Sequence, residues 1–199
     1  MSILVTKEAP DFTCAAVMAN GSIKADFKLS SLRGKYVVLF FYPLDFTFVC
    51  PSEILAHNNR VAKFKEIGVE LIGVSIDSEF THLAWRNTPV EKGGIGPIQF
   101  PLVADKKHEI CQAYGVELPG GVALRASFLI DKNGIVQHQV VNNLPLGREV
   151  DEMIRMVEAL KFTEEFGEVC PAGWRKGDEA MKPTAEGVAK YLAKHASSL

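Results

Sequence analysis

The sequence predicts an α/β sandwich in which a central mixed β-sheet is flanked by helices. Two observations favour this class. Short apolar segments rich in β-branched and aromatic residues alternate with segments whose apolar residues have helical spacing, which is typical of strand–helix–strand units. Later in the chain an Asn-Gly pair separates two further apolar segments. Because this pair suits a tight hairpin, part of the sheet is expected to be antiparallel.

The first strand–helix–strand unit begins with a continuously apolar segment, Tyr36 to Tyr42 (YVVLFFY). Such a segment is expected to form a central strand that is buried on both faces. Residues from Glu53 to Lys65 carry apolar side chains at helical spacing, and Gly68 is placed to end that helix. A second strand is expected from Val69 to Ile76.

The hairpin and a later helix complete the predicted sandwich. Asp131 to Gly134 is expected to turn the chain between strands at Ala126 to Ile130 and Ile135 to Val141. Val150 to Leu160 then places apolar residues on one helical face and acids in the first turn. This order of elements matches a thioredoxin-like sandwich, here with an N-terminal hairpin added.

The last part of the chain differs in composition. From about Phe162 glycine, proline and charged residues become frequent, before a short helical stretch near Ala185 to His195. We therefore predict a thioredoxin-like domain at residues 1–161 and a C-terminal arm at residues 162–199.

Composition and charge exclude several classes of function. The chain has 199 residues, of which 47% are hydrophobic and 23% charged, as in a folded soluble protein. A net charge of -2 gives no general attraction for nucleic acids or anionic membranes. The N-terminus lacks a long apolar stretch, and no segment approaches membrane-spanning length. We expect a cytoplasmic protein that binds neither nucleic acid nor membrane.

Four cysteines are scattered along the chain: Cys14, Cys50, Cys111 and Cys170. They are too few to staple a chain of this length, so a disulfide formed in a reducing cytosol is expected to be catalytic. Cys50 lies where the central strand gives way to the first long helix. If Thr47 caps that helix, Cys50 is its third residue, where unpaired N–H groups and the helix dipole favour a thiolate.

A thiolate alone accounts for only part of an enzymatic rate, so a cation and a hydroxyl are expected near it. Arg125 begins an apolar strand and therefore needs a partner, which an anionic sulfur or a salt bridge at the strand edge would supply. Glu53 has two interpretations as well: an acid favoured in the first helical turn, or a residue of the site.

The pattern Pro43-x-x-x-Thr47-x-x-Cys50 resembles the peroxidatic motif of the peroxiredoxins, and the segment FFYPLDFTFVCPSE is similar to their typical two-cysteine class. The similarity covers almost the whole chain. It includes Ala9-Pro10-Asp11-Phe12, Leu83-Ala84-Trp85 and Gly167-Glu168-Val169-Cys170-Pro171.

The resemblance implies a role for each matching residue. Cys50 would be the peroxidatic cysteine and Cys170 the resolving cysteine, whereas Cys14 and Cys111 match no redox position and are expected to be structural. The remaining implied site residues are those that activate the peroxide, Thr47 and Arg125, the one that shields the thiolate, Pro43, and two that support the arginine, Glu53 and Arg148.

The resemblance also implies a reaction cycle. Cys50 would reduce hydrogen peroxide or an alkyl hydroperoxide and become a sulfenic acid, and after local opening of the first helical turn and the arm it would form a disulfide with Cys170. That disulfide would join two subunits of a homodimer, with five dimers closing into a ring, although the sequence separation alone does not exclude an intrachain bond. Thioredoxin or a flavoprotein disulfide reductase would reduce it, and no cofactor is implied.

Sensitivity to excess peroxide stays open. Gly93-Gly94-Ile95-Gly96 resembles the GGLG loop of sensitive peroxiredoxins, whereas Tyr191-Leu192 replaces their Tyr-Phe pair.

Two other functions are compatible with a fold of this class. A thiol–disulfide oxidoreductase of the same fold would be expected to carry C-x-x-C, which is absent from the sequence. A holdase or scaffold role is compatible with the enzyme. The five histidines form no ligand pair at standard spacing, so no metal site is predicted.

Overall fold

The computed structural model describes residues 3–198. Its internal contacts divide the chain after Val150 into two compact units, and each unit is described by itself. The described helices include none with the length and apolarity needed to span a bilayer.

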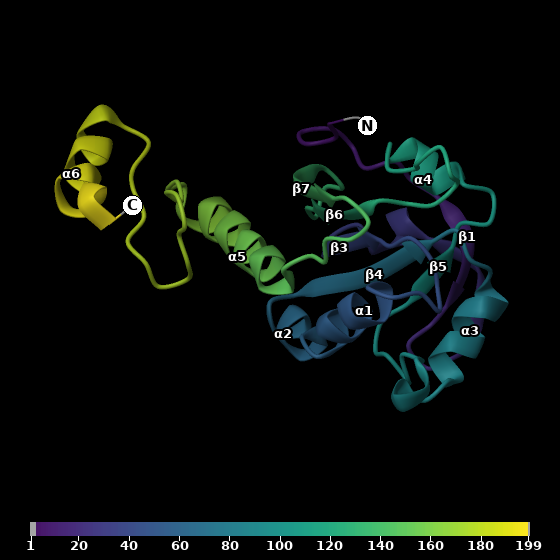
Figure 1. The fold of residues 1–199 in the computed structure, drawn as a ribbon. Coiled ribbons are helices and arrows are strands. Elements are labelled where there is room, and N and C mark those ends of the chain that lie inside the picture. Colours follow the sequence, from purple (N-terminus) through teal and green to yellow (C-terminus); the bar gives the residue numbers. More distant parts are fainter. Residues whose placement is uncertain (1–2, 199) are drawn as a thin grey trace. The chain divides into compact units, whose positions relative to one another are not determined.

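The first unit contains seven strands and four α-helices among its described residues (Figure 1). In chain order these are β1 (Thr13–Val17), β2 (Ile23–Lys28), β3 (Tyr36–Phe41), α1 (Cys50–Asn58), α2 (Val61–Glu66), β4 (Val69–Ser75), α3 (Glu79–Asn87), β5 (Leu102–Ala104), α4 (Glu109–Ala113), β6 (Arg125–Ile130) and β7 (Val136–Asn142). The second unit contains α5, which spans Val150–Phe166 from the last residue of the first unit, and α6 (Ala185–His195).

The seven strands form one mixed sheet in the order β2-β1-β5-β4-β3-β6-β7. β3, β4 and β5 are parallel, whereas β6 and β7 and the N-terminal hairpin of β1 and β2 pair antiparallel. All six residues of β3 are buried, as its apolar sequence predicts. The predicted mixed sheet, N-terminal hairpin and thioredoxin-like sandwich are confirmed.

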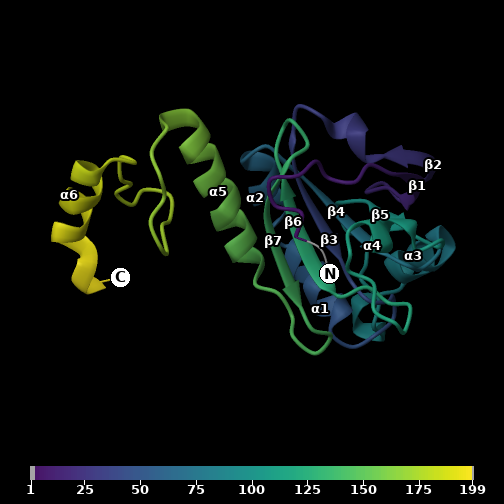
Figure 2. The same cartoon turned by 90° about the horizontal axis from the view of Figure 1, so that it is seen from above.

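The sheet lies between two helical layers, with α1 on one side and α4 on the other (Figures 1 and 2). Alternate residues of a strand such as β3 face opposite sides of the sheet. On one face the Phe40 ring stacks on His57 of α1, with ring centroids 4.1 Å apart. On the other face Phe41 packs against Tyr114, just after α4, at 5.1 Å. The central strand therefore ends between two packed layers, and the loop that leaves it is held at a fixed place.

The first predicted helix differs from the structure. The single helix expected from Glu53 to Lys65 is divided into α1 and α2 at Asn59 and Arg60. Asn58 and Asn59 have weak helix propensity. Arg60 N–H donates to the His57 carbonyl, three residues back, which tightens the turn and ends the helix.

The turn between β6 and β7 needs a glycine. Gly134 has φ +82°, and a Cβ atom at this position would lie 0.6 Å from Nη1 of Arg33. Arg33 occupies that space because its guanidinium donates to the Asn133 carbonyl and to Glu8. The Asn-Gly pair therefore serves a close approach as well as a turn.

The second unit has its own small apolar centre. Trp174 is 3% exposed, and its ring lies 4.9 Å from that of Phe162 on α5. Arg155 donates to the Trp174 carbonyl at 3.0 Å, and Val169 pairs with Met181 in an isolated bridge. These contacts hold the segment around Cys170 in place within this unit.

Candidate active site

Cys50 is the first residue of α1, at the end of the loop that leaves β3. The prediction that Thr47 caps the helix is wrong, because Val49 is the N-cap residue and no side chain caps it. Thr47 instead uses its hydroxyl as a donor, to the Leu44 carbonyl at 2.8 Å. Cys50 still lies at a helix N-terminus, where the positive end of the dipole favours an anion.

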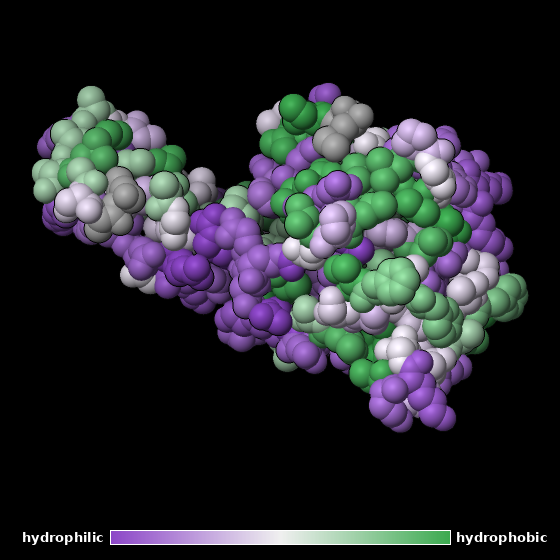
Figure 3. Space-filling model, in the orientation of Figure 1, coloured by the Kyte–Doolittle hydropathy of each residue, from purple (hydrophilic) through white to green (hydrophobic). Residues whose placement is uncertain are grey.

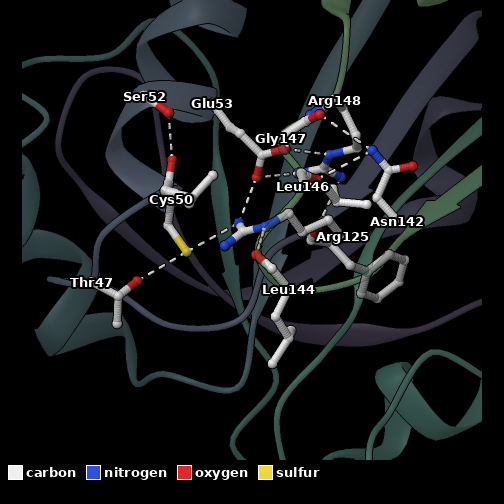
Figure 4. A network of polar contacts seen from close by, with 12 residues as sticks. Thr47, Cys50, Ser52, Glu53, Arg125, Asn142, Leu144, Leu146, Gly147 and Arg148 are labelled. Carbon is white, nitrogen blue, oxygen red and sulfur yellow. Dashed lines mark hydrogen bonds and ion pairs between the residues drawn. The ribbon is translucent and has the colours of Figure 1, made fainter.

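Two hydrogen-bond donors reach the sulfur of Cys50 (Figure 4). Thr47 Oγ1 lies 3.0 Å from Sγ, and Nη1 of Arg125 lies 3.4 Å from it. Arg125 comes from the first position of β6, on the strand next to β3, so two neighbouring strands bring the cation and the thiol together. The guanidinium and the hydroxyl expected from the sequence therefore both contact the sulfur.

Arg125 also forms a salt bridge with Glu53, so it contacts both the Cys50 sulfur and a carboxylate. Its Nη1 donates to Glu53 Oε2 at 2.7 Å, and its Nε donates to the Leu144 carbonyl at 2.6 Å. Burial tends to lower the pKa of Arg125, but hydrogen bonds to Cys50 and Glu53 outweigh it and raise that pKa. The guanidinium is therefore a permanent cation in a fixed orientation.

Glu53 is shared between two arginines. Arg148 Nε donates to Glu53 Oε1 at 2.8 Å, opposite the contact with Arg125, and both side chains of this second pair are 3% exposed. Burial alone would raise the pKa of the Glu53 carboxyl, but hydrogen bonds and charge from Arg148 lower it. Glu53 is thus a buried carboxylate that orients Arg125, and more than a favourable acid in a first helical turn.

Arg148 joins the elements that surround the site. Its Nη1 donates to the carbonyls of Phe41 and Ala126, on β3 and β6, at 2.8 and 2.6 Å. The guanidinium also lies over the Phe40 ring, 5.4 Å from its centroid. Arg148 therefore ties the ends of both strands to Glu53 on α1.

The sulfur lies inside the protein. Cys50 is 0% exposed, and Pro43, which begins the loop directly after β3, is buried as well. Thr47 and Val49 are half-buried. The loop and the first turn of α1 therefore enclose the sulfur.

The other three cysteines are free thiols outside this network. Cys170 lies in the second unit, half-buried, with Sγ 3.7 Å from the Ala159 carbonyl. Cys14 donates to the Ala104 carbonyl, and burial raises the pKa of its thiol. Burial also raises the pKa of Cys111 strongly. Both of these latter environments favour the unreactive thiol.

A buried polar network beside the site was not predicted from the sequence. Asp45 Oδ1 accepts from the Tyr42 hydroxyl at 2.8 Å, and its Oδ2 lies 2.7 Å from Nδ1 of His82. The Asp45 N–H donates to Asp77. His82 and Trp85 are three residues apart and share a helix face, which is the one sequence signal that His82 is buried.

This network also contains metal-ligand side chains. Ligand atoms of Asp45, Asp77 and His82 lie within 4.8 Å of one another. Both Asp45 oxygens and Oδ2 of Asp77 are already engaged in hydrogen bonds, and the second nitrogen of His82 lies 3.2 Å from the Val103 carbonyl. A metal ion would have to displace these partners, so we interpret the group as a hydrogen-bond network.

Comparisons with known proteins agree with this geometry. The sequence pattern of the AhpC/TSA family matches residues 5–139, and that of the C-terminal domain of 1-Cys peroxiredoxin matches residues 159–194. The chain is 58% identical to an alkyl hydroperoxide reductase C of Helicobacter pylori, covering 99% of this chain and 100% of the relative.

Two further relatives extend the similarity. Peroxiredoxin-2 of Cricetulus griseus is 52% identical, with 96% of each chain covered. The crystal structure of reduced Plasmodium vivax 2-Cys peroxiredoxin superposes with a TM-score of 0.94 at 51% identity, covering 96% of this chain and 100% of that one.

Proposed function

Because the chain belongs to the AhpC/TSA family and is a thiol-dependent peroxidase, we propose that Cys50 is its peroxidatic cysteine and Cys170 its resolving cysteine. The observation that carries the proposal is the pair of donors, Thr47 Oγ1 and Arg125 Nη1, at 3.0 and 3.4 Å from Cys50 Sγ. The substrates are hydrogen peroxide and alkyl hydroperoxides.

The first step is attack of the Cys50 thiolate on one oxygen of the peroxide. An S–O bond forms as the O–O bond breaks, the second oxygen leaves with the electron pair, and a proton converts it to water or an alcohol. Arg125 stabilises the charge that moves from sulfur to oxygen, and Thr47 helps to activate the peroxide by a hydrogen bond. Glu53 and Arg148 keep Arg125 in place, and Pro43 helps to exclude bulk water from the sulfur.

The second step forms a disulfide between Cys50 and Cys170. The Cys170 sulfur attacks the sulfenic sulfur of Cys50, and the hydroxyl leaves as water. Thioredoxin, or a flavoprotein disulfide reductase with a thioredoxin-like carrier domain, then reduces the disulfide with two electrons. No cofactor bound to this chain is needed, and the reaction takes place in the cytoplasm. Residues 1–161 form the peroxidase domain, and the arm at residues 162–199 supplies Cys170.

The disulfide is proposed to join two copies in a homodimer, with five dimers in a ring. Two observations support self-association of the first unit. β7 is an outer strand of the sheet; Thr6 and Lys7 pair with its first residue, Val136, and the strand beyond Val136 offers an edge for pairing. Large hydrophobic side chains are also exposed, among them Phe48 at 97% and Phe80 at 67%, and hydrophobic residues gather in patches on the face shown in Figure 3.

Steady-state peroxide consumption with a thioredoxin system tests the roles of the cysteines. We expect Cys50→Ser to abolish turnover, because the attacking sulfur is lost. Cys170→Ser is expected to react once and then stop, since its sulfenic acid has no resolving partner. Cys14→Ser is the matched control and should keep wild-type turnover. Normal turnover by Cys50→Ser would refute the proposal.

Co-expression of Cys50→Ser with Cys170→Ser tests whether the disulfide joins two subunits. After peroxide treatment, a non-reducing gel should show a covalent dimer only when both variants are present in one assembly. A dimer band that is absent from the co-expressed pair, while the wild type forms its disulfide, would place the bond within one chain.

A further inference from the structure

The peptide unit that joins Leu44 to Asp45 connects the buried network to the site. Its N–H donates to Asp77 Oδ2 at 2.9 Å, and its carbonyl accepts from Thr47 Oγ1 at 2.8 Å. A trans peptide is planar, with its N–H and C=O directed to opposite sides. Fixing the N–H on Asp77 therefore fixes the direction of the carbonyl that Thr47 uses.

Asp77 is itself attached to the end of β4. The hydroxyl of Ser75, the last residue of that strand, donates to Asp77 Oδ2 at 2.7 Å and accepts from the Asp77 N–H at 3.2 Å. Ser75 is 0% exposed. The acceptor for the Leu44–Asp45 peptide unit is thus held by a buried strand next to β3 and does not depend on the loop.

The loop between Tyr42 and Cys50 needs such an anchor. Phe46 has φ +54°, in the left-handed region that residues other than glycine rarely adopt. A strained residue of this kind persists only when its surroundings determine its conformation. The side chain of Asp45 holds the loop to Tyr42 and His82, and Asp77 holds its backbone, so the conformation is fixed from two sides.

The Leu44 carbonyl determines where the Thr47 hydroxyl directs its proton. A hydroxyl has one proton to donate and lone pairs to accept with. Leu44 O at 2.8 Å and Cys50 Sγ at 3.0 Å compete for that proton. When the proton is directed to Leu44 O, a lone pair of Oγ1 is available on the sulfur side to accept the O–H of a hydroperoxide. When it is directed to the sulfur, Oγ1 presents its proton on that side and is no longer an acceptor for the O–H of the hydroperoxide.

We propose that Asp77 is a positioning residue for peroxide reduction, which acts through the Leu44–Asp45 peptide unit to keep the Thr47 hydroxyl an acceptor toward the hydroperoxide. The inference rests on the proposed roles of Cys50 and Thr47. It concerns the orientation of the peroxide and not the formation of the thiolate, so the reactivity of Cys50 toward other reagents should be insensitive to Asp77.

The test compares two reactions of the same sulfur by stopped flow: oxidation by hydrogen peroxide and alkylation by iodoacetamide. Asp77→Ala is expected to slow oxidation about ten- to a hundredfold, as misplacement of a reacting group does, and to leave alkylation near the wild-type rate. Asp77→Asn keeps an oxygen that can accept from the Asp45 N–H, so it should recover most of the oxidation rate. Equal losses in both reactions, or unchanged oxidation in Asp77→Ala, would overturn the inference.

A double-mutant cycle shows whether Asp77 acts through Thr47. Thr47→Val removes the hydroxyl, and Asp77→Ala added to it should slow oxidation no further; independent, additive losses would contradict the inference. If peroxide consumes no Cys50 thiol in the wild type, the proposed function itself fails. If it does, and Thr47→Val slows oxidation while Asp77→Ala does not, only the role of Asp77 fails.

Discussion

At the scale of single residues, the site places the permanently charged guanidinium of Arg125 beside the buried sulfur of Cys50. Arg125 is 4% exposed and contacts both Cys50 and Glu53 through the same nitrogen. A buried guanidinium next to one carboxylate is neutralised, and the thiolate then adds a second negative partner. Arg148 also pairs with Glu53, so one carboxylate is shared by two guanidinium groups and does not neutralise Arg125 alone.

Replacing Arg125 tests this arrangement. We expect Arg125→Gln to lower the second-order rate constant for peroxide by about a hundred- to a thousandfold, which is typical for loss of one donor to transition-state charge. The rate constant of Arg125→Lys should lie between those of the wild type and Arg125→Gln. Lysine keeps the charge but cannot contact Leu144, Glu53 and Cys50 together. Arg33→Gln, which removes an exposed ion pair with Glu8, is the control. A wild-type rate in Arg125→Gln would contradict the role given to it.

The sequence predicted which residues meet at this site better than it predicted their local geometry. Thr47, Cys50, Glu53, Arg125 and Arg148 do meet in one network. The position of Cys50 in the helix was wrong by two residues, because the Thr47 hydroxyl bonds to a loop carbonyl that no local pattern reveals. The network of Asp77 could not be predicted, since its members come from separate elements that meet only when the sheet forms.

At the scale of elements, α1 is joined to the sheet through a neutral histidine. His57 is 2% exposed, stacks on Phe40 of β3, and has Nδ1 2.7 Å from the Glu53 carbonyl. Burial, together with the charge of Arg148, lowers the pKa of His57 to about 3. The unfolded chain therefore takes up this proton at a higher pH than the folded chain, and stability due to His57 is lost as the pH falls below about 6.5.

Acid denaturation of a His57→Gln variant checks this linkage. Between pH 7 and pH 5 the free energy of unfolding of the wild type should fall by about 2 kcal/mol more than that of the variant, because only the wild type gains a proton at this position on unfolding. Urea titrations of the reduced protein at the two pH values provide the measurement. Parallel losses in both proteins would show that His57 is charged in the folded state.

The predicted elements were accurate where periodicity alone decides them. The helix expected at Ala185 to His195 has those bounds, and the strands differ from prediction by a residue at their ends. The break between α1 and α2 was missed, since the apolar spacing continues through it. Helical periodicity indicates which side chains face the core, but it does not indicate where a single turn tightens, as the turn at Arg60 does.

At the scale of the whole molecule, the mixed sheet explains why residues distant in sequence form one site. β3 lies between β4 and β6, so the loop after β3 meets Asp77 beyond the end of β4 and Arg125 at the start of β6. Strand order of this kind follows from the fold class, which the sequence predicted. The proposed pairing of Cys50 with Cys170 does not follow from it, because the spacing of two cysteines in one chain does not show whether they bond within that chain or between two copies.

Trapping of the first oxidation product tests the role of Cys50 at this scale. Reduced Cys170→Ser protein is treated with one equivalent of hydrogen peroxide in the presence of dimedone, which reacts with sulfenic acids, and the adduct is located by peptide mass spectrometry. We expect the adduct on Cys50, with Cys14 and Cys111 unmodified. An adduct on either of those cysteines while Cys50 stays reduced, or consumption of peroxide that leaves Cys50 a free thiol, would contradict the mechanism.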